Sequence, residues 1–101
     1  MLTRIVKMTF KKENIPSFEQ IFQASRPVIT AFPGCEGVTL YRDLDRPEIF
    51  VTYSIWDTDA ALQDYRRSPF FREVWGQTKA LFAAPAEAWS LEEQTGEATN
   101  P

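Results

Sequence analysis

Lys7 is the side chain of this sequence best suited to proton transfer or to holding an anion. It lies in the segment from Leu2 to Phe10, where apolar and polar residues alternate as in a β-strand. On the inner side of such a strand a lysine would lose hydration, and its pKa would fall, which suits either role. The same side chain could instead reach the end of the sheet and stay in water. We take Lys7 as the candidate catalytic residue.

Aromatic and hydroxyl side chains provide the candidate binding residues. Trp56 ends a segment rich in β-branched residues, and Phe71 and Trp75 recur at helical spacing further along. If the sheet face that carries Lys7 looks toward the helices, these rings would wall a cavity with a few polar groups, as in small-molecule pockets. The alternative is that each ring belongs to an ordinary core. The candidate substrate-binding residues are Trp56, Trp75, Phe71, Phe22, Thr9 and Thr52.

The composition argues against several other kinds of site. The 101 residues include no histidine, one cysteine and four scattered glycines. Without histidine there is no support for catalysis by imidazole, and without clustered glycines there is none for a phosphate-binding loop. Zinc and iron–sulfur sites are nearly excluded. Cys35 lies in a turn sequence and has no histidine to activate it, so a tolerated small residue explains it better than a reactive thiol. We expect neither a metal nor a cofactor.

The charge and hydropathy of the chain limit its partners and its location. Eleven Lys and Arg residues against fourteen Asp and Glu residues give a formal charge of −3, the wrong sign for binding a phosphate backbone. The N-terminal segment lacks a signal-peptide pattern, and no stretch reaches the roughly 20 apolar residues of a membrane helix. We expect a cytoplasmic protein that binds neither nucleic acid nor membrane.

These side chains must be positioned by the elements that the pattern predicts. Strands are predicted over 2–10, 37–43, 49–56 and 86–92. One helix is predicted over 16–32, kinked or divided at Pro27, a second begins near 57–59, and a third begins at Ser68-Pro69 and ends at Pro85. The order β-α-β-β-α-β is typical of a ferredoxin-like α+β fold with an antiparallel sheet. We expect one domain over residues 1–92 and a polar, loose tail over 93–101.

The third predicted strand is apolar on both of its sides. Ile49, Val51, Tyr53 and Ile55 form one side, and Phe50, Thr52, Ser54 and Trp56 form the other. Helices within the chain can cover only one face of the sheet, and a bare second face would be a large exposed apolar patch. A symmetric copy of the chain would cover it. The sequence therefore predicts a homodimer.

Three segments of the sequence carry a family resemblance. They are FPGCEG at 32–37, FVTYSIWDTDAAL at 50–62 and YRRSPFF at 65–71. Over about residues 2 to 92 the chain resembles the antibiotic biosynthesis monooxygenase family of dimeric α/β barrels. The resemblance implies a homodimer whose two sheets form a barrel, with each active site between the sheet and the helices of one subunit.

The resemblance also limits the activity. The family includes cofactor-free monooxygenases of phenolic and quinol substrates, haem-degrading enzymes, isomerases and proteins without an assigned reaction. Its haem-degrading branch has a tryptophan at Trp56, a histidine near Trp75 and an asparagine near Lys7, and here only the tryptophan is kept. This favours a cofactor-independent monooxygenase acting on a small aromatic, phenolic or quinol substrate, with Lys7 stabilising its anion. A non-catalytic dimeric small-molecule-binding protein and an isomerase or lyase on the same fold remain alternatives.

Overall fold

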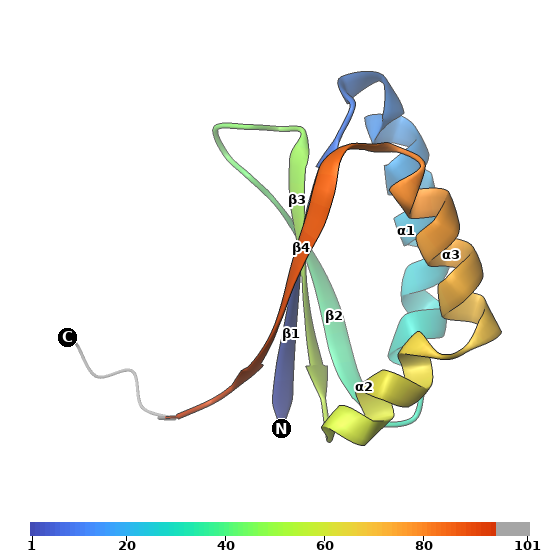
Figure 1. The fold of residues 1–101 in the computed structure, drawn as a ribbon, viewed down its shortest axis with the longest axis vertical. Coiled ribbons are helices and arrows are strands. Elements are labelled where there is room, and N and C mark those ends of the chain that lie inside the picture. Colours follow the sequence, from blue (N-terminus) through green and yellow to red (C-terminus); the bar gives the residue numbers. More distant parts are fainter. Residues whose placement is uncertain (95–101) are drawn as a thin grey trace.

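The computed structural model describes residues 1–94 and has the predicted order of strands and helices (Figure 1). The elements are β1 (Leu2–Phe10), the short 3-10 helix η1 (Lys12–Asn14), α1 (Ile15–Thr30), β2 (Cys35–Arg42), β3 (Ile49–Trp56), α2 (Asp59–Arg66), α3 (Pro69–Lys79) and β4 (Phe82–Glu92). The strands form one antiparallel sheet in the order β2-β3-β1-β4. This is the predicted ferredoxin-like α+β fold. Most of the predicted tail, residues 95–101, lies outside the described residues.

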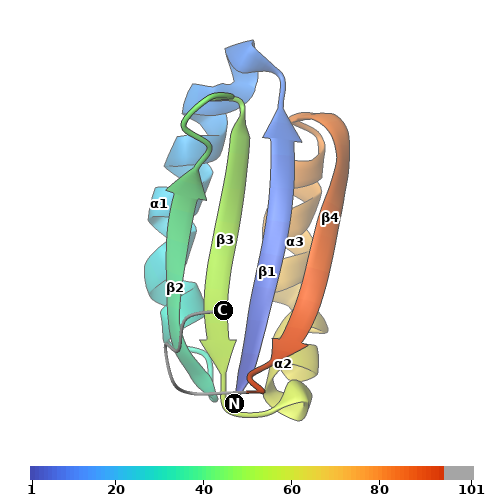
Figure 2. The same cartoon turned by 90° about the vertical axis from the view of Figure 1, so that its left-hand side faces the viewer.

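All three α-helices lie on one face of the sheet. Figure 1 shows the sheet edge-on with α1, α2 and α3 on the same side, and Figure 2 shows the opposite face with no helix in front of it. β1 and β3 occupy the centre of the sheet and pair with each other over their length, from Leu2 opposite Trp56 to Thr9 opposite Ile49. The chain therefore buries one face of its sheet and leaves the other open.

Local capping explains where α2 and α3 begin. The Thr58 hydroxyl accepts a hydrogen bond from the backbone N–H of Ala61, and the Ser68 hydroxyl accepts one from the N–H of Phe71. Each contact satisfies an amide that the first helical turn leaves unpaired. Pro69 occupies the first helical position, where a proline costs no hydrogen bond. Both helix starts agree with the sequence prediction.

Pro27 does not divide α1, contrary to one of the two predicted outcomes. The helix runs undivided from Ile15 to Thr30 with Pro27 in its last turns. Pro27 removes only the hydrogen bond to the carbonyl of Gln23, and both residues are exposed, so that water can reach this carbonyl. The Thr30 hydroxyl donates to the carbonyls of Arg26 and Pro27 and so occupies acceptors at the helix end.

The last helix ends earlier, and the last strand begins earlier, than the sequence predicts. α3 ends at Lys79, and Phe82, expected in the helix, instead lies in β4 opposite Phe10. Pro85, expected to end the helix, lies inside β4. It is tolerated there because β4 is an edge strand whose register against β1 shifts in this region.

The buried apolar side chains form two clusters between sheet and helices. The first contains Met8, Phe10, Ile15, Phe18 and Phe50, and the second contains Ile29, Val38, Trp56, Leu62 and Tyr65. Phe22 of α1 packs against both clusters. Within residues 1–94, no helix is long and apolar enough to cross a membrane.

Candidate functional site

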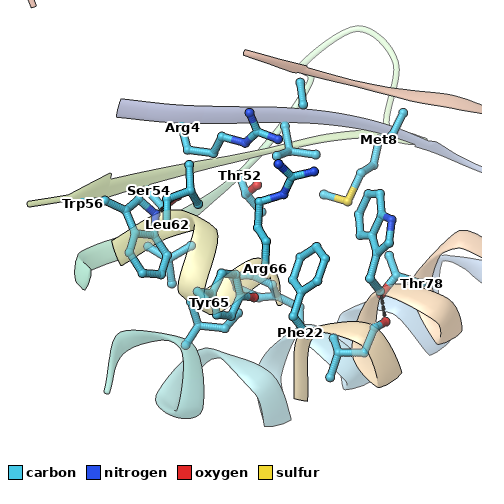
Figure 3. Close-up of a pocket in the computed structure, with 18 of the residues that line it drawn as sticks. Arg4, Met8, Phe22, Thr52, Ser54, Trp56, Leu62, Tyr65, Arg66 and Thr78 are labelled. Carbon is cyan, nitrogen blue, oxygen red and sulfur yellow. Dashed lines mark hydrogen bonds between the residues drawn. The ribbon is translucent and has the colours of Figure 1, made fainter. Parts of the chain in front are cut away.

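A cavity of about 350 Å³ lies between the sheet and the helix layer (Figure 3). Its lining draws on both core clusters, so the cavity separates them. The sheet contributes Arg4, Val6, Met8, Val38, Thr52, Ser54, Trp56, Ala86 and Ala88. The helices contribute Phe18, Phe22, Ile29, Leu62, Tyr65, Arg66, Phe71, Val74, Trp75 and Thr78. All four strands and all three α-helices therefore shape one mostly apolar space, the usual character of a small-molecule site.

Four aromatic rings form a continuous wall of this cavity. Trp56 stacks on Tyr65 with ring centroids 5.1 Å apart, and Tyr65 meets Phe71 edge to face, also at 5.1 Å. Phe71 in turn stacks on Trp75 at 5.9 Å. This aromatic wall runs from the end of β3 across α2 to α3. Because aromatic pairs are rigid and favour flat partners, the wall suits a planar ring.

Hydrogen bonding fixes Trp56 at the end of β3. Only 1% of Trp56 is exposed, and its indole N–H donates to the hydroxyl of Ser54 at 3.0 Å. A buried indole N–H without an acceptor would cost free energy, so Ser54 satisfies this donor. Trp56 therefore presents a fixed apolar surface to the cavity.

Tyr65 supplies a neutral hydroxyl at the cavity. Burial raises the pKa of its phenol, and the thiolate that Cys35 forms at high pH raises it further. The shift is far enough that the hydroxyl keeps its proton throughout the physiological range. Tyr65 can therefore donate a hydrogen bond to a ligand oxygen but cannot act as a base there.

Arg4 and Arg66 approach the cavity from opposite walls (Figure 3). Arg4 comes from the central strand β1, and Arg66 is the last residue of α2. Burial lowers the pKa of Arg4, the positive charge of Arg66 lowers it further, and the charge of Asp59 partly raises it. An arginine stays protonated under such shifts. Two positive charges thus lie beside a largely apolar cavity.

The structure places Lys7 and Thr9 away from the cavity, which corrects the sequence prediction. Lys7 pairs with Val51 and Thr9 with Ile49 in the β1–β3 register, so both side chains point to the open face of the sheet, opposite Trp56. The ammonium of Lys7 lies 3.5 Å from the carboxylate of Glu87, with 40% of the lysine side chain exposed. Lys7 is therefore a solvent-side residue and not an inner one.

The remaining sequence candidates do meet around the cavity. Trp56, Trp75, Phe71, Phe22 and Thr52 all line it. Their part in binding a substrate stays a prediction.

The sequence analysis missed Arg4 and Arg66, for which the sequence does carry a signal. Arg4 shares the alternation of Val6 and Met8, and Arg66 follows the buried Leu62 by four residues, which places it on the same helix face.

Comparison with known proteins assigns the family. The model of the family described as antibiotic biosynthesis monooxygenase matches residues 1–75, from β1 into α3. The chain belongs to this family. The matched range contains Arg4, Trp56, Tyr65, Arg66 and most of the cavity lining.

One curated relative of this family member has no described function. It is the uncharacterized protein sll1783 of Synechocystis, 32% identical over 78 residues, which are 76% of this chain and 50% of the relative. The chain therefore spans about half the length of this relative.

Solved structures agree on the antibiotic biosynthesis monooxygenase fold. Rv0793 from Mycobacterium tuberculosis has a TM-score of 0.86 at 20% identity, covering 97% of this chain and 98% of its own. SnoaB, a cofactor-independent oxygenase from Streptomyces nogalater, has a TM-score of 0.85 at 19% identity and covers 97% of each chain. At these identities the likeness establishes the fold.

The cavity of this antibiotic biosynthesis monooxygenase family member lacks an obvious proton acceptor. Among the described residues, its lining contains no Asp, Glu, Lys or Cys side chain, and the sequence has no histidine. No cluster of three metal-binding side chains occurs in residues 1–94. The chemistry that the lining offers is therefore apolar contact, hydrogen bonding and positive charge.

Proposed function

We propose that this protein is a cofactor-independent monooxygenase acting on a small aromatic, phenolic or quinol substrate. The observation that carries the proposal is the cavity of about 350 Å³, which combines an aromatic wall with two arginines. Such a space fits a planar ring and favours its anion. The family assignment supports an oxygenase, and the fold shared with the cofactor-independent oxygenase SnoaB supports chemistry without a bound group.

In the proposed reaction the substrate itself reduces oxygen. In an anthrone-like phenol, a ring methylene loses four electrons and becomes a carbonyl. In a quinol, a ring C–H becomes C–OH and the ring becomes a quinone, which is also a loss of four electrons. In both cases one atom of O₂ enters the product, and the other leaves as water with two hydrogens of the substrate. The positive charges of Arg4 and Arg66 stabilise negative charge on the bound substrate and so favour an anionic substrate. The aromatic wall fixes the ring, while Tyr65 can donate a hydrogen bond to its oxygen.

A non-catalytic binding protein is the second candidate function. It is favoured by one observation, the lack of a proton-accepting side chain in the described cavity lining. An isomerase or lyase would need such an acceptor to move a proton, so the cavity supports it less. An oxygenase needs none if the substrate enters as its anion.

Oxygen consumption tests the proposed function. Purified protein is given hydroquinones and anthrone-like phenols with a chelator present, and the uptake of O₂ is followed. We expect uptake that depends on the protein and resists the chelator. Replacing the stacked Trp75 by Leu should lower kcat/KM about tenfold, since an aromatic contact and its buried area are lost. The exposed Arg72→Ala on the same helix, which does not line the cavity, is the control.

Each contrary result identifies a different function. If a panel compound binds but is not converted in air, the protein is a binding protein and not an oxygenase. Conversion that continues under argon would point to an isomerase or lyase.

We also propose a homodimer formed through the open face of the sheet, with the small aromatic molecule bound inside each protomer. Tyr41, Tyr53, Trp89 and Leu91 are exposed on that face, an arrangement that favours a second apolar surface. The proposed cytoplasmic location rests on the sequence, whose single cysteine fits a reducing compartment.

A further inference from the structure

Two guanidinium groups share the cavity, and no Asp or Glu among residues 1–94 lines it. Burial is the main cause that lowers the pKa of Arg4, and the charge of Arg66 is the next, so the two cations are close enough to repel each other. Asp59 acts on Arg4 in the opposite direction but forms no ion pair with it. Two like charges held near each other in a partly buried site repel, and an anion bound between them offsets that repulsion.

The neighbouring Arg67 has an acidic partner, so acidic residues are available close to the cavity arginines. Arg67 follows Arg66 directly, and its guanidinium lies 2.9 Å from the carboxylate of Asp64. In residues 1–94 the ion pairs are Arg67 with Asp64 and Lys7 with Glu87, both outside the cavity lining. The whole chain has a net charge of −3, so its positive charges at the cavity are a local feature.

Both cavity arginines have hydrogen-bond donors left over. Arg4 donates to the hydroxyl of Ser90 at 2.9 Å, and Arg66 donates to the side-chain oxygen of Gln63 at 3.3 Å. Each guanidinium carries five N–H donors, so most of them are free for a ligand. The planar fork of a guanidinium matches the two oxygens of a carboxylate.

We propose that the substrate of this cavity is an aromatic carboxylate, whose carboxylate is held jointly by Arg4 from the sheet and Arg66 from α2. Its ring lies against the aromatic wall, beside Tyr65 (Figure 3). The carboxylate lies between the two cations, where its negative charge offsets their repulsion. This inference deepens the proposed function by naming the charged group of its substrate, and it rests on the same cavity.

Titration calorimetry with a matched pair of ligands tests the arginine pair. The probes are 2-naphthoate and its neutral analogue 2-naphthamide, which have nearly the same shape and differ in charge. We expect 2-naphthoate to bind about tenfold more tightly, as hydrogen bonds to charged groups exceed neutral ones. Arg66→Met and Arg4→Met should each remove most of this preference, Arg4→Lys should restore part of it, and Arg67→Met should leave it unchanged.

The outcomes separate this inference from the proposed function. Equal affinity for the two probes, or a preference that survives in both methionine variants, would overturn the arginine pair and leave the oxygenase proposal intact. Failure of 2-naphthoate to bind while the phenol panel is still oxidised would overturn the arginine pair alone. Selective binding of 2-naphthoate without any oxygen uptake would keep the arginine pair and remove the oxygenase. Arg66 is exposed at the end of α2, so Arg66→Met tests the inference even if Arg4→Met fails to fold.

Discussion

Trp56 and Ser54 form the polar contact that fixes the sheet side of the cavity. Trp56 is among the largest fully buried side chains, and its single N–H has the Ser54 hydroxyl as its acceptor. Ser54 is itself buried, and the β1–β3 register places it opposite Arg4. Ser90 of β4 lies opposite Arg4 on the other side but is exposed. The two serines thus flank one arginine in contrasting surroundings.

We expect Ser54→Ala to lower the free energy of unfolding by about 1–3 kcal/mol, because the buried indole N–H of Trp56 loses its acceptor. Ser90→Ala should change it by about 0.5 kcal/mol or less, as expected for a solvent-exposed position. Urea unfolding at one fixed protein concentration measures both. Equal losses in the two variants would mean that the hydrogen bond of Trp56 contributes no special stability.

The residues of the site could be predicted from the sequence only in part. Alternation along β1 places Lys7 and Arg4 on opposite sides of the strand, but alternation within one strand does not say which side faces the helices. That depends on the register against β3, in which Leu2 meets Trp56. The prediction that Lys7 shares the face of Trp56 is therefore wrong, and Arg4 is the cation that β1 places at the cavity. Phe22, Phe71 and Trp75 were placed correctly at the cavity because helical spacing is a local property.

Among the secondary-structure elements, the turn before β2 holds α2 in place. Gly34 has φ +86°, a left-handed conformation, and an ideal Cβ on it would lie 2.5 Å from the Cβ of Ala61 in α2. Its carbonyl accepts the N–H of Asp57 at 2.8 Å, directly after β3. Glycine is therefore required here for two independent reasons, conformation and close approach. The turn secures the start of the helix that carries Leu62, Tyr65 and Arg66.

We expect Gly34→Ala to destabilise the protein by about 2 kcal/mol or more, from backbone strain together with the clash on Ala61. Gly76 is the matched control because an added Cβ there meets nothing within 4 Å inside α3. Gly76→Ala should stabilise the protein by up to about 1 kcal/mol through helix propensity. Thermal unfolding of both variants checks the contrast, and a stable Gly34→Ala would contradict it.

The elements were predictable where their signals are local. Strand β3 has the predicted bounds, and the caps Thr58 and Ser68-Pro69 start helices as expected. The start of β4 was not predictable from local pattern. It is determined by the pairing of Phe82 with Phe10, residues far apart in the sequence, which overrides the usual effect of Pro85.

At the scale of the whole molecule, the two faces of the sheet differ in how they are covered. The helices bury one face together with the cavity, while no helix covers the other face (Figure 2). That open face carries exposed aromatic and aliphatic side chains. On that open face 43% of Trp89 and 48% of Leu91 are exposed. Apolar surface gathered on one side of a monomer is typical of an interface. The cavity, in contrast, lies between the helices and the other face of the sheet.

We therefore expect a mass of two chains by light scattering at micromolar concentration. Trp89→Glu should reduce this mass to that of one chain, because a buried carboxylate without a partner opposes association. Val28→Glu is the control, since Val28 is an exposed apolar residue of α1, which lies on the other side of the sheet. The monomeric variant should still bind 2-naphthoate, because the lining residues that residues 1–94 supply remain in place. A single-chain mass for the unaltered protein would contradict the homodimer, and a dimeric Trp89→Glu would place the interface elsewhere.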